Sequence, residues 1–224
     1  MHTVRVWDLP TRLFHWTLAA CVFGLLITGN IGGNWMNWHL RLGYSVLTLL
    51  LFRLVWGFVG GHWSRFGSFI YAPSTLLRYL RGHGDAAHTV GHSPLAALSV
   101  FALLAVLLLQ VGTGLIADDE IAFTGPLVRF VSGDTISSAT SYHKNIGKFV
   151  VIGLVVLHLA AIVFYKLVKK QSLVRPMILG DKTLTTAAPE TRDSARSRLV
   201  ALGVLLACAG FVRWVVSLGT FAGY

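Results

Sequence analysis

The chain has 224 residues, of which 54% are hydrophobic and only 12% are charged, and its formal net charge is +10. A soluble protein of this composition would lack the polar side chains needed to cover its surface, so the sequence indicates an integral membrane protein. The positive charge is expected mainly on a cytoplasmic face that lies against anionic membrane lipid, and no nucleic-acid partner is needed to explain it.

Five apolar runs are close to the length of about 20 residues that a helix needs to cross a bilayer. They cover residues 12–30, 39–60, 93–116, 141–166 and 199–218. None alternates apolar and polar residues as the strands of a membrane barrel do. The first run lacks a convincing cleavage site and is expected to be retained. Its start is marked by Asp8 and Pro10, residue types that open helices.

The distribution of lysine and arginine predicts the orientation, because cationic residues near the ends of spans are kept in the cytoplasm. Cationic residues gather at the amino terminus, after the second run and after the fourth run, as Arg5, Arg12, Arg65, Arg78, Arg81, Lys166, Lys169, Lys170, Arg175, Lys182, Arg192, Arg196 and Arg198. The loop before the fourth run instead carries Asp118, Asp119, Glu120 and Asp134 against Arg129. We expect a cytoplasmic amino terminus and, after five crossings, a carboxyl terminus that is periplasmic or otherwise external.

The two cysteines, Cys21 and Cys208, both fall inside apolar runs. The sequence has no C-x-x-C pair and no C-x-x-C-H motif, which argues against a zinc site, a redox disulfide and covalent haem. An iron–sulfur cluster usually needs four thiolates and is excluded for this chain alone.

The nine histidines divide by location. Those at the amino terminus and in or beside the cytoplasmic loop are expected to be solvated, namely His2, His62, His83, His88 and His92. The other four lie in the spans or at their ends, where polar groups are costly and usually have a partner or a function. These four are His15, His39, His143 and His158. A single histidine of this kind would be read as a hydrogen-bonded structural residue, so the question is whether the four form pairs.

His143 and His158 are 15 residues apart on one predicted helix, which corresponds to about 22 Å of rise and about 60° of rotation. The first span starts in the cytoplasm, so His15 lies at the depth of His158. The second span starts outside, so His39 lies at the depth of His143. Two neutral imidazoles that face each other across a helical bundle are the expected axial ligands of a haem. The sequence therefore predicts two non-covalent b-type haems at two depths.

Other uses of these histidines fit less well. Zinc or non-haem iron would need three or four converging ligands, often with carboxylates, and no Asp or Glu lies in any of the five runs. A proton relay usually includes acidic residues as well.

Four segments in this order carry a family resemblance: VWDLPTRLFHWTLAACVFGLLITG, HLRLGYSVLTLLLFRLVWGFVGG, GHSPLAALSVFALLAVLLLQVGTGLIADDEIAFTGPL, and the stretch from YHKN to VRPMILG. They resemble the bacterial cytochrome b561 and nickel–iron hydrogenase b-type cytochrome family, over about residues 4–182. The resemblance implies a four-helix diheme bundle with ligands from helices one, two and four, which are His15, His39, His143 and His158 here. We expect residues 1–182 to form this domain, 183–198 a polar cytoplasmic linker, and 199–224 an additional transmembrane helix.

Further residues are expected to support the haems. Gly43 and Gly147 each follow an external-side ligand by four residues, where the missing side chain would let a porphyrin approach. Arg41 and Lys144 lie beside those ligands and either pair with haem propionates or snorkel to headgroups. Arg53 lies deeper, near the cytoplasmic-side haem, where it would pair with a propionate or a quinone oxygen unless it snorkels. An aromatic belt at the membrane interfaces is expected from Trp35, Trp38, Trp56 and Trp63.

The main functional hypothesis is a cytochrome that transfers electrons across the bacterial inner membrane between ubiquinone or menaquinone and a periplasmic redox protein, with a c-type cytochrome as the first candidate. Three alternatives stay open: a superoxide/quinone oxidoreductase, the membrane anchor of a periplasmic nickel–iron hydrogenase, and a scaffold or channel without redox function. Whether the chain is itself an enzyme, and whether it forms a homo-oligomer, are also open. Quinone is expected on the cytoplasmic side by analogy with related cytochromes. The acidic loop is expected near the external-side haem, where it would attract a basic partner.

Overall fold

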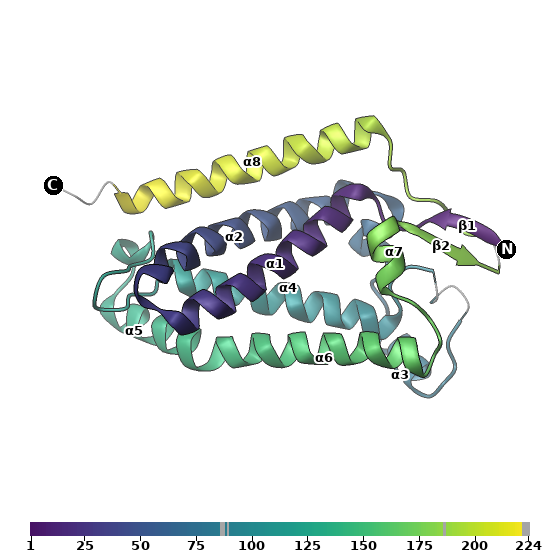
Figure 1. Cartoon of the computed structure of the whole chain (residues 1–224), viewed down its shortest axis with the longest axis horizontal. Coiled ribbons are helices and arrows are strands. Elements are labelled where there is room, and N and C mark those ends of the chain that lie inside the picture. Colours follow the sequence, from purple (N-terminus) through teal and green to yellow (C-terminus); the bar gives the residue numbers. More distant parts are fainter. Residues whose placement is uncertain (86–87, 89, 186, 221–224) are drawn as a thin grey trace. The chain divides into compact units, whose positions relative to one another are not determined.

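The structure is a computed structural model that describes residues 1–85, 88, 90–185 and 187–220 (Figure 1). Helices dominate it. The longer elements are β1 (His2–Arg5), α1 (Leu9–Ile31), α2 (Met36–Val59), α3 (Pro73–Leu80), α4 (Pro94–Leu115), α5 (Gly133–Ser141), α6 (Lys148–Leu167), α7 (Val174–Leu179), β2 (Asp181–Leu184) and α8 (Ala195–Thr220). Short 3-10 turns cover Gly33–Trp35, His62–Ser64, Phe66–Ser68 and Val128–Phe130, and a π-helical turn covers Tyr142–Gly147.

Five helical stretches of the described chain are long and apolar enough to cross a membrane. They are Leu9–Ile31, Gly33–Val59, Pro94–Leu115, Gly133–Leu167 and Ala195–Gly219, one for each predicted span. The all-α membrane fold expected from the apolar runs is therefore confirmed. α8 begins at Ala195, so the end of the expected polar linker is helical. The last four residues of the expected 199–224 segment lie outside the described residues.

The chain divides into two compact units. The first unit contains Met1–His15, Arg53–Ala102 and Leu154–Gly203, and the second contains Trp16–Phe52, Leu103–Gly153 and Val204–Tyr224. Each of the five long helices contributes residues to both units. His15 and His158 belong to the first unit, and His39 and His143 belong to the second.

The first unit contains a two-stranded antiparallel sheet that the sequence analysis did not predict. β1 pairs with β2 so that His2 faces Leu184 and Arg5 faces Asp181. Val4, Val6, Trp7, Val90 and Leu184 form a small buried core on this sheet. The sheet joins the amino terminus to the segment that follows α7.

Asp8 fixes the start of α1 within the first unit. Its side chain is fully buried, and its Oδ1 accepts a hydrogen bond from the amide of Thr11 at 2.9 Å, as expected for a helix cap. Its Oδ2 accepts from the Gly61 amide at 3.1 Å, Ser64 Oγ at 3.0 Å and Trp56 Nε1 at 3.2 Å. Trp56 is only 1% exposed, so the expectation that it belongs to an interfacial aromatic belt is wrong.

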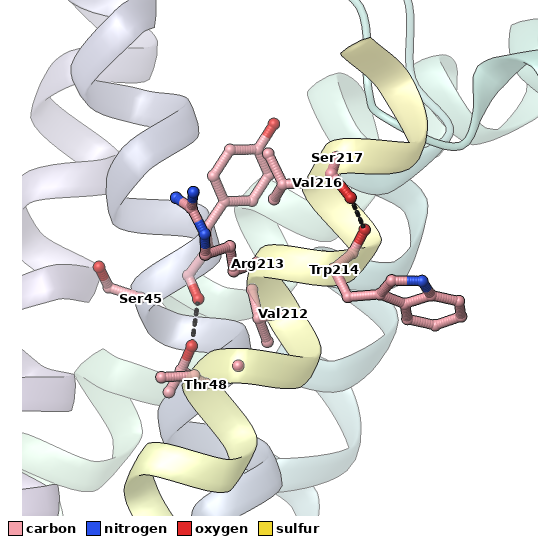
Figure 2. A pocket seen from close by; sticks show the side chains of 10 residues that line it. Ser45, Thr48, Val212, Arg213, Trp214, Val216 and Ser217 are labelled. Atoms are coloured by element: carbon pink, nitrogen blue, oxygen red, sulfur yellow. Dashed lines mark hydrogen bonds between the residues drawn. The ribbon is translucent and has the colours of Figure 1, made fainter. Parts of the chain in front are cut away.

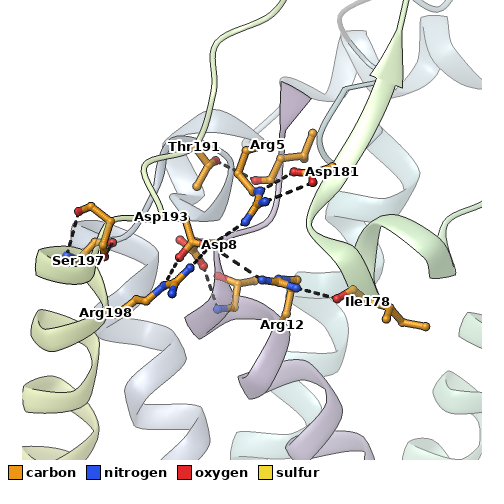
Figure 3. A network of polar contacts seen from close by, with 12 residues as sticks. Arg5, Asp8, Arg12, Ile178, Asp181, Thr191, Asp193, Ser197 and Arg198 are labelled. Carbon is orange, nitrogen blue, oxygen red and sulfur yellow. Dashed lines mark hydrogen bonds and ion pairs between the residues drawn. The ribbon is translucent and has the colours of Figure 1, made fainter. Parts of the chain in front are cut away.

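The segment between β2 and α8 is held to the first unit by polar contacts (Figure 3). Asp193 accepts from Arg5 Nη1 at 3.0 Å and Arg198 Nε at 2.9 Å, and Arg12 Nη2 lies 3.9 Å away. Burial alone would raise the pKa of Asp193, but hydrogen bonds from Arg198, the main chain of Leu9 and Arg5 outweigh burial and lower it. Thr191 adds a hydrogen bond from its Oγ1 to the main-chain oxygen of Val6 at 2.8 Å.

Candidate haem-binding sites

The four span histidines form two facing pairs in the structure. The ring centroids of His15 and His158 are 6.3 Å apart, and those of His39 and His143 are 6.1 Å apart. These are the pairs expected from the direction of each helix. A first-row metal ion binds an imidazole nitrogen at about 2.0–2.1 Å, so two rings on opposite sides of one ion have centroids roughly 6 Å apart. Each pair thus has the ring spacing of two histidines that would hold one metal ion between them.

Hydrogen bonds orient both rings of the pair in the second unit. His143 Nδ1 lies 2.9 Å from the main-chain oxygen of Gln110, and His39 Nδ1 lies 3.2 Å from that of Leu25. A carbonyl oxygen can only accept, so Nδ1 carries the proton in both rings and Nε2 keeps its lone pair. Metal-binding histidines usually have such a partner, which fixes the tautomer and makes the ligand nitrogen more basic.

The His39/His143 pair lies in a cavity of about 500 Å³ within the second unit. This volume is within the range of about 300–1,000 Å³ that is usual for cofactor sites. Most of the lining is apolar and comes from α1, α2 and α4, including Val22, Leu25, Leu26, Leu40, Val46, Leu107 and Val111. A large planar hydrophobic group therefore suits this cavity.

Glycines allow helices to approach both rings. A Cβ atom on Gly29 would lie 3.0 Å from His39 Cε1, and one on Gly114 would lie 2.9 Å from His143 Cε1. Gly43 lines the cavity, and a Cβ atom there would meet nothing within 4 Å. The structure gives Gly147 a different role from the expected one. A Cβ atom there would lie 1.9 Å from Gln110 Oε1, so Gly147 permits helix packing.

The two cationic residues expected beside this pair, Arg41 and Lys144, have different surroundings in the structure. Lys144 is among the described residues that line the cavity, together with Lys148, whereas Arg41 is not among them. The Arg41 guanidinium carbon instead lies 5.3 Å from the ring centroid of Trp38.

The acidic loop contributes to the same cavity through Asp118, Asp119 and Ile121. Asp119 Oδ1 accepts hydrogen bonds at 2.9 Å from the amides of Ile121, Ala122 and Phe123. The amides of Phe123 and Ala122 hold the pKa of Asp119 below its usual value. Asp119 therefore shapes the loop, a role that the sequence analysis missed.

Arg53 lies in the first unit with His15 and His158. Its side chain is only 3% exposed, and its guanidinium carbon lies 4.7 Å from the ring centroid of Phe66. The Nη1 atom is buried and has no hydrogen-bond partner among the described residues. A buried donor of this kind needs an acceptor, and a propionate or carbonyl oxygen would supply one.

His92 is the functional candidate that the sequence analysis missed. The prediction that it is solvated is wrong, because its ring lies 4.3 Å from that of Phe69 and 4.7 Å from that of Trp7. Its Nδ1 is buried without a hydrogen-bond partner in the described part of the chain. Burial, followed by the charges of Arg53 and His15, lowers the pKa of His92 to about 3, so the ring is neutral at pH 7. His88 is also buried, and its Nδ1 accepts from the Asp85 amide at 3.2 Å.

No cluster of three or more His, Cys, Asp or Glu side chains that could hold a metal ion occurs among the residues that the structure describes. A zinc or non-haem iron site of the usual kind is therefore not formed by these residues. The paired imidazoles, the apolar cavity and the buried Arg53 Nη1, which has no hydrogen-bond partner among the described residues, fit a haem.

A family model for prokaryotic cytochrome b561 matches residues 6–180. The chain belongs to this family. A probable Ni/Fe-hydrogenase B-type cytochrome subunit from Bradyrhizobium diazoefficiens is 24% identical over 215 residues, which cover 80% of this chain and 86% of that protein. Proteins with the same description from Rhizobium leguminosarum bv. viciae and Rhodobacter capsulatus are 24% and 25% identical, and the matches cover 80% and 81% of this chain and 89% and 82% of those proteins.

This cytochrome b561 is a multi-pass membrane protein that binds b-type haem and serves electron transport. The matched range includes the first four spans and ends before α8. The fifth helix is therefore additional to the part of the chain that the family model describes.

Proposed function

We propose that this cytochrome carries two haems, one between His15 and His158 and the other between His39 and His143, and moves electrons across the bacterial inner membrane. The observation that carries the proposal is the matching separation of the two pairs, 6.3 and 6.1 Å, with each pair inside its own unit. Bound haem would supply reversible one-electron oxidation and reduction of iron. The protein's part is to hold the ligands, exclude water and adjust the potentials.

Individual residues have distinct roles in this proposal. Leu25 and Gln110 orient the imidazoles of His39 and His143 through their main-chain oxygens and present Nε2 to the metal. The apolar lining of the second-unit cavity keeps water from the site, which influences the reduction potential. Lys144 is positioned to neutralise a propionate at the cavity wall.

We infer that a quinone, either ubiquinone or menaquinone, exchanges electrons near His15 and His158. Support comes from Arg53, whose Nη1 is buried and unpartnered among the described residues. A guanidinium can donate to a quinone carbonyl oxygen or to a haem propionate. The concentration of Lys and Arg in the segments flanking these histidines supports a cytoplasmic location for this end.

We propose a nickel–iron hydrogenase as the redox partner. The three relatives described above carry the name of hydrogenase cytochrome subunits and match most of this chain. Their names favour the hydrogenase alternative over the c-type cytochrome that the sequence analysis put first. The chain would then link hydrogen oxidation or formation to the quinone pool.

The test is hydrogen-dependent reduction of the haems in membranes that contain the chain and the hydrogenase from the same organism. Hydrogen should reduce both haems, and added quinone should reoxidise them. A hydrogenase lacking its catalytic activity serves as the control. If hydrogen does not reduce the haems but a reduced c-type cytochrome does, the redox partner is a c-type cytochrome and not the hydrogenase.

A further inference from the structure

Two of the long helices carry a five-residue segment of the same kind where a paired histidine lies against them. α1 carries LLITG at residues 25–29, and α4 carries QVGTG at residues 110–114. In both segments the first residue accepts a hydrogen bond from the histidine, the fourth is a threonine, and the fifth is the glycine that lets the ring approach. We name these segments the α1 seat, which receives His39, and the α4 seat, which receives His143. Both lie within the second unit.

The distances in the two seats agree. In the α1 seat, His39 Nδ1 lies 3.2 Å from the main-chain oxygen of Leu25 and 3.3 Å from Thr28 Oγ1. In the α4 seat, the histidine Nδ1 lies 2.9 Å from the main-chain oxygen of Gln110 and 3.5 Å from Thr113 Oγ1. Each ring therefore meets a carbonyl oxygen and a threonine oxygen through the same nitrogen.

The direction of each threonine hydroxyl follows from its other contacts. Thr28 Oγ1 donates to the main-chain oxygen of Gly24 at 2.8 Å, and Thr113 Oγ1 donates to that of Leu109 at 2.9 Å. A hydroxyl has one proton, so the lone pairs of both oxygens remain available to the histidines. The Nδ1–H group of each histidine is thus shared between two acceptors, as in a bifurcated hydrogen bond.

A threonine that donates to the preceding turn has no functional meaning by itself, because serine and threonine often do so in helices. The seats differ from that common case in the position of the threonine. In both helices it follows the carbonyl that accepts from the histidine by three residues, which places the two oxygens on one face of the helix. The same arrangement on two helices, one for each ring of a pair, points to a shared role.

We propose that Thr28 and Thr113 are positioning residues that lower the reduction potential of the haem between His39 and His143. A second acceptor at Nδ1–H makes the opposite ring nitrogen a stronger electron donor, which favours oxidised iron, the more positively charged state. The threonines act through different ligands, so their effects should multiply. This inference rests on the proposed binding of a haem between these histidines and names the side chains that set its potential.

A redox titration of the purified full-length chain, followed by haem absorbance, tests this role. His39→Ala loses the haem in question and so assigns the two potentials. Thr28→Val and Thr113→Val nearly keep the side-chain volume and remove the acceptor. Each should shift the ratio of reduced to oxidised haem about threefold toward the reduced form, and the double variant about ninefold. For a one-electron couple, at about 59 mV per tenfold change, these are upward shifts of about 28 and about 56 mV. The haem of the first unit should keep its potential.

Thr48→Val is the matched control (Figure 2). Thr48 lies on α2 in the second unit and donates to the main-chain oxygen of Tyr44 at 3.0 Å, four residues earlier, as the seat threonines do. It lines a separate groove together with residues of α8, so its loss should leave both potentials unchanged. Thr28→Ser and Thr113→Ser keep the hydroxyl and should stay close to the wild-type potential.

Wild-type potentials in both valine variants would overturn the proposal, as would an equal shift in Thr48→Val. Serine variants with the potentials of the valine variants would also overturn it, because the hydroxyl would then have no part in the effect. If a valine variant loses the haem, the proposal holds only when the matching serine variant keeps it. A wild type without a haem at His39 and His143 would instead contradict the proposed function, so the two failures are distinguishable.

Discussion

His143 and Gln110 are joined by two reciprocal hydrogen bonds between neighbouring helices. His143 Nδ1 donates to the main-chain oxygen of Gln110 at 2.9 Å, and Gln110 Nε2 donates to the main-chain oxygen of His143 at 3.0 Å. His143 lies in the π-helical turn Tyr142–Gly147, and such turns are frequent at functional sites. α4 therefore contributes to the site without supplying a ligand of its own.

The close packing of α4 on His143 predicts a selective effect of Gly114→Ala. The new Cβ would lie 2.9 Å from His143 Cε1 and push the ring from its place. We expect the haem content of the purified chain to fall by about half, because only the His39/His143 site is affected. Gly112→Ala on the same helix is the control, since a Cβ there meets nothing within 4 Å. Equal haem content in the two variants would contradict this packing account.

Arg53 is predicted to affect the rate of haem reduction by quinol more than it affects haem binding. Arg53→Leu keeps an apolar body against Phe66 and removes the buried donor, so quinol should reduce the haems about tenfold more slowly. The dithionite-reduced spectrum should be unchanged, because the ligands remain. Stopped-flow absorbance measures the rate, and Arg53→Lys should retain part of it. A normal rate of reduction by quinol with an intact spectrum would show that the quinone site lies elsewhere. Loss of one haem would indicate that Arg53 binds a haem propionate.

The contacts of Asp193 predict how firmly the start of α8 is held. Asp193→Asn weakens the hydrogen bonds from Arg5 and Arg198, so trypsin should cleave at Arg196 about tenfold faster. Asp85→Asn is the control, because the Asp85–Arg78 pair is 3.5 Å long and largely exposed, and such pairs contribute little. The same cleavage rate in both variants would show that Asp193 does not anchor the segment.

The pKa of Asp193 gives this prediction a pH dependence. The pKa is depressed in the folded state, so the stabilisation is present above the unfolded-state value of about 3.9 and is lost only as the pH falls through the lower folded-state value. Asp193 therefore stays ionised between about pH 6 and pH 8. Over this range the ratio of the Asp193→Asn cleavage rate to the wild-type rate should not change with pH.

The five long helices and the two histidine pairs could be predicted from the sequence, because both depend on local features of the chain. Apolar run length predicts the five helices, and the direction of each helix predicts which histidine meets which. The paired strands β1 and β2 could not be predicted, since His2 and Leu184 are brought together by the fold and neither strand shows a strong pattern. The main-chain acceptors for His39 and His143 could not be predicted either, because every residue has a carbonyl group and only packing selects Leu25 and Gln110.

The polar sequence around His92 predicts a solvated ring, and only the structure shows Trp7 and Phe69 against it. The expectation of an interfacial Trp56 fails for a similar reason. The ends of spans look alike in sequence whether they meet lipid or a buried carboxylate such as Asp8. Both corrections concern contacts between residues far apart in the chain.

The acidic loop predicts a salt-dependent encounter with the redox partner. Charge attraction is screened over a Debye length of about 8 Å at physiological ionic strength, so the bimolecular rate should fall as salt is added. Glu120→Gln should lower the rate about twofold at low salt. Asp119→Asn should also disturb the loop, because its Oδ1 accepts three main-chain hydrogen bonds. A rate indifferent to salt and to Glu120→Gln would indicate apolar docking, or a small molecule reacting at this site, as in a superoxide/quinone oxidoreductase.

The count of haems in single-histidine variants tests the central claim most directly. The wild type should contain two acid-acetone-extractable haems per chain with a low-spin spectrum. His15→Ala and His158→Ala should each lose the same haem, identified by its potential, and His39→Ala and His143→Ala should each lose the other. His62→Ala, an exposed histidine outside the pairs, should keep both. One haem in the wild type, or loss of the same haem from His39→Ala and His158→Ala, would contradict the two-site account.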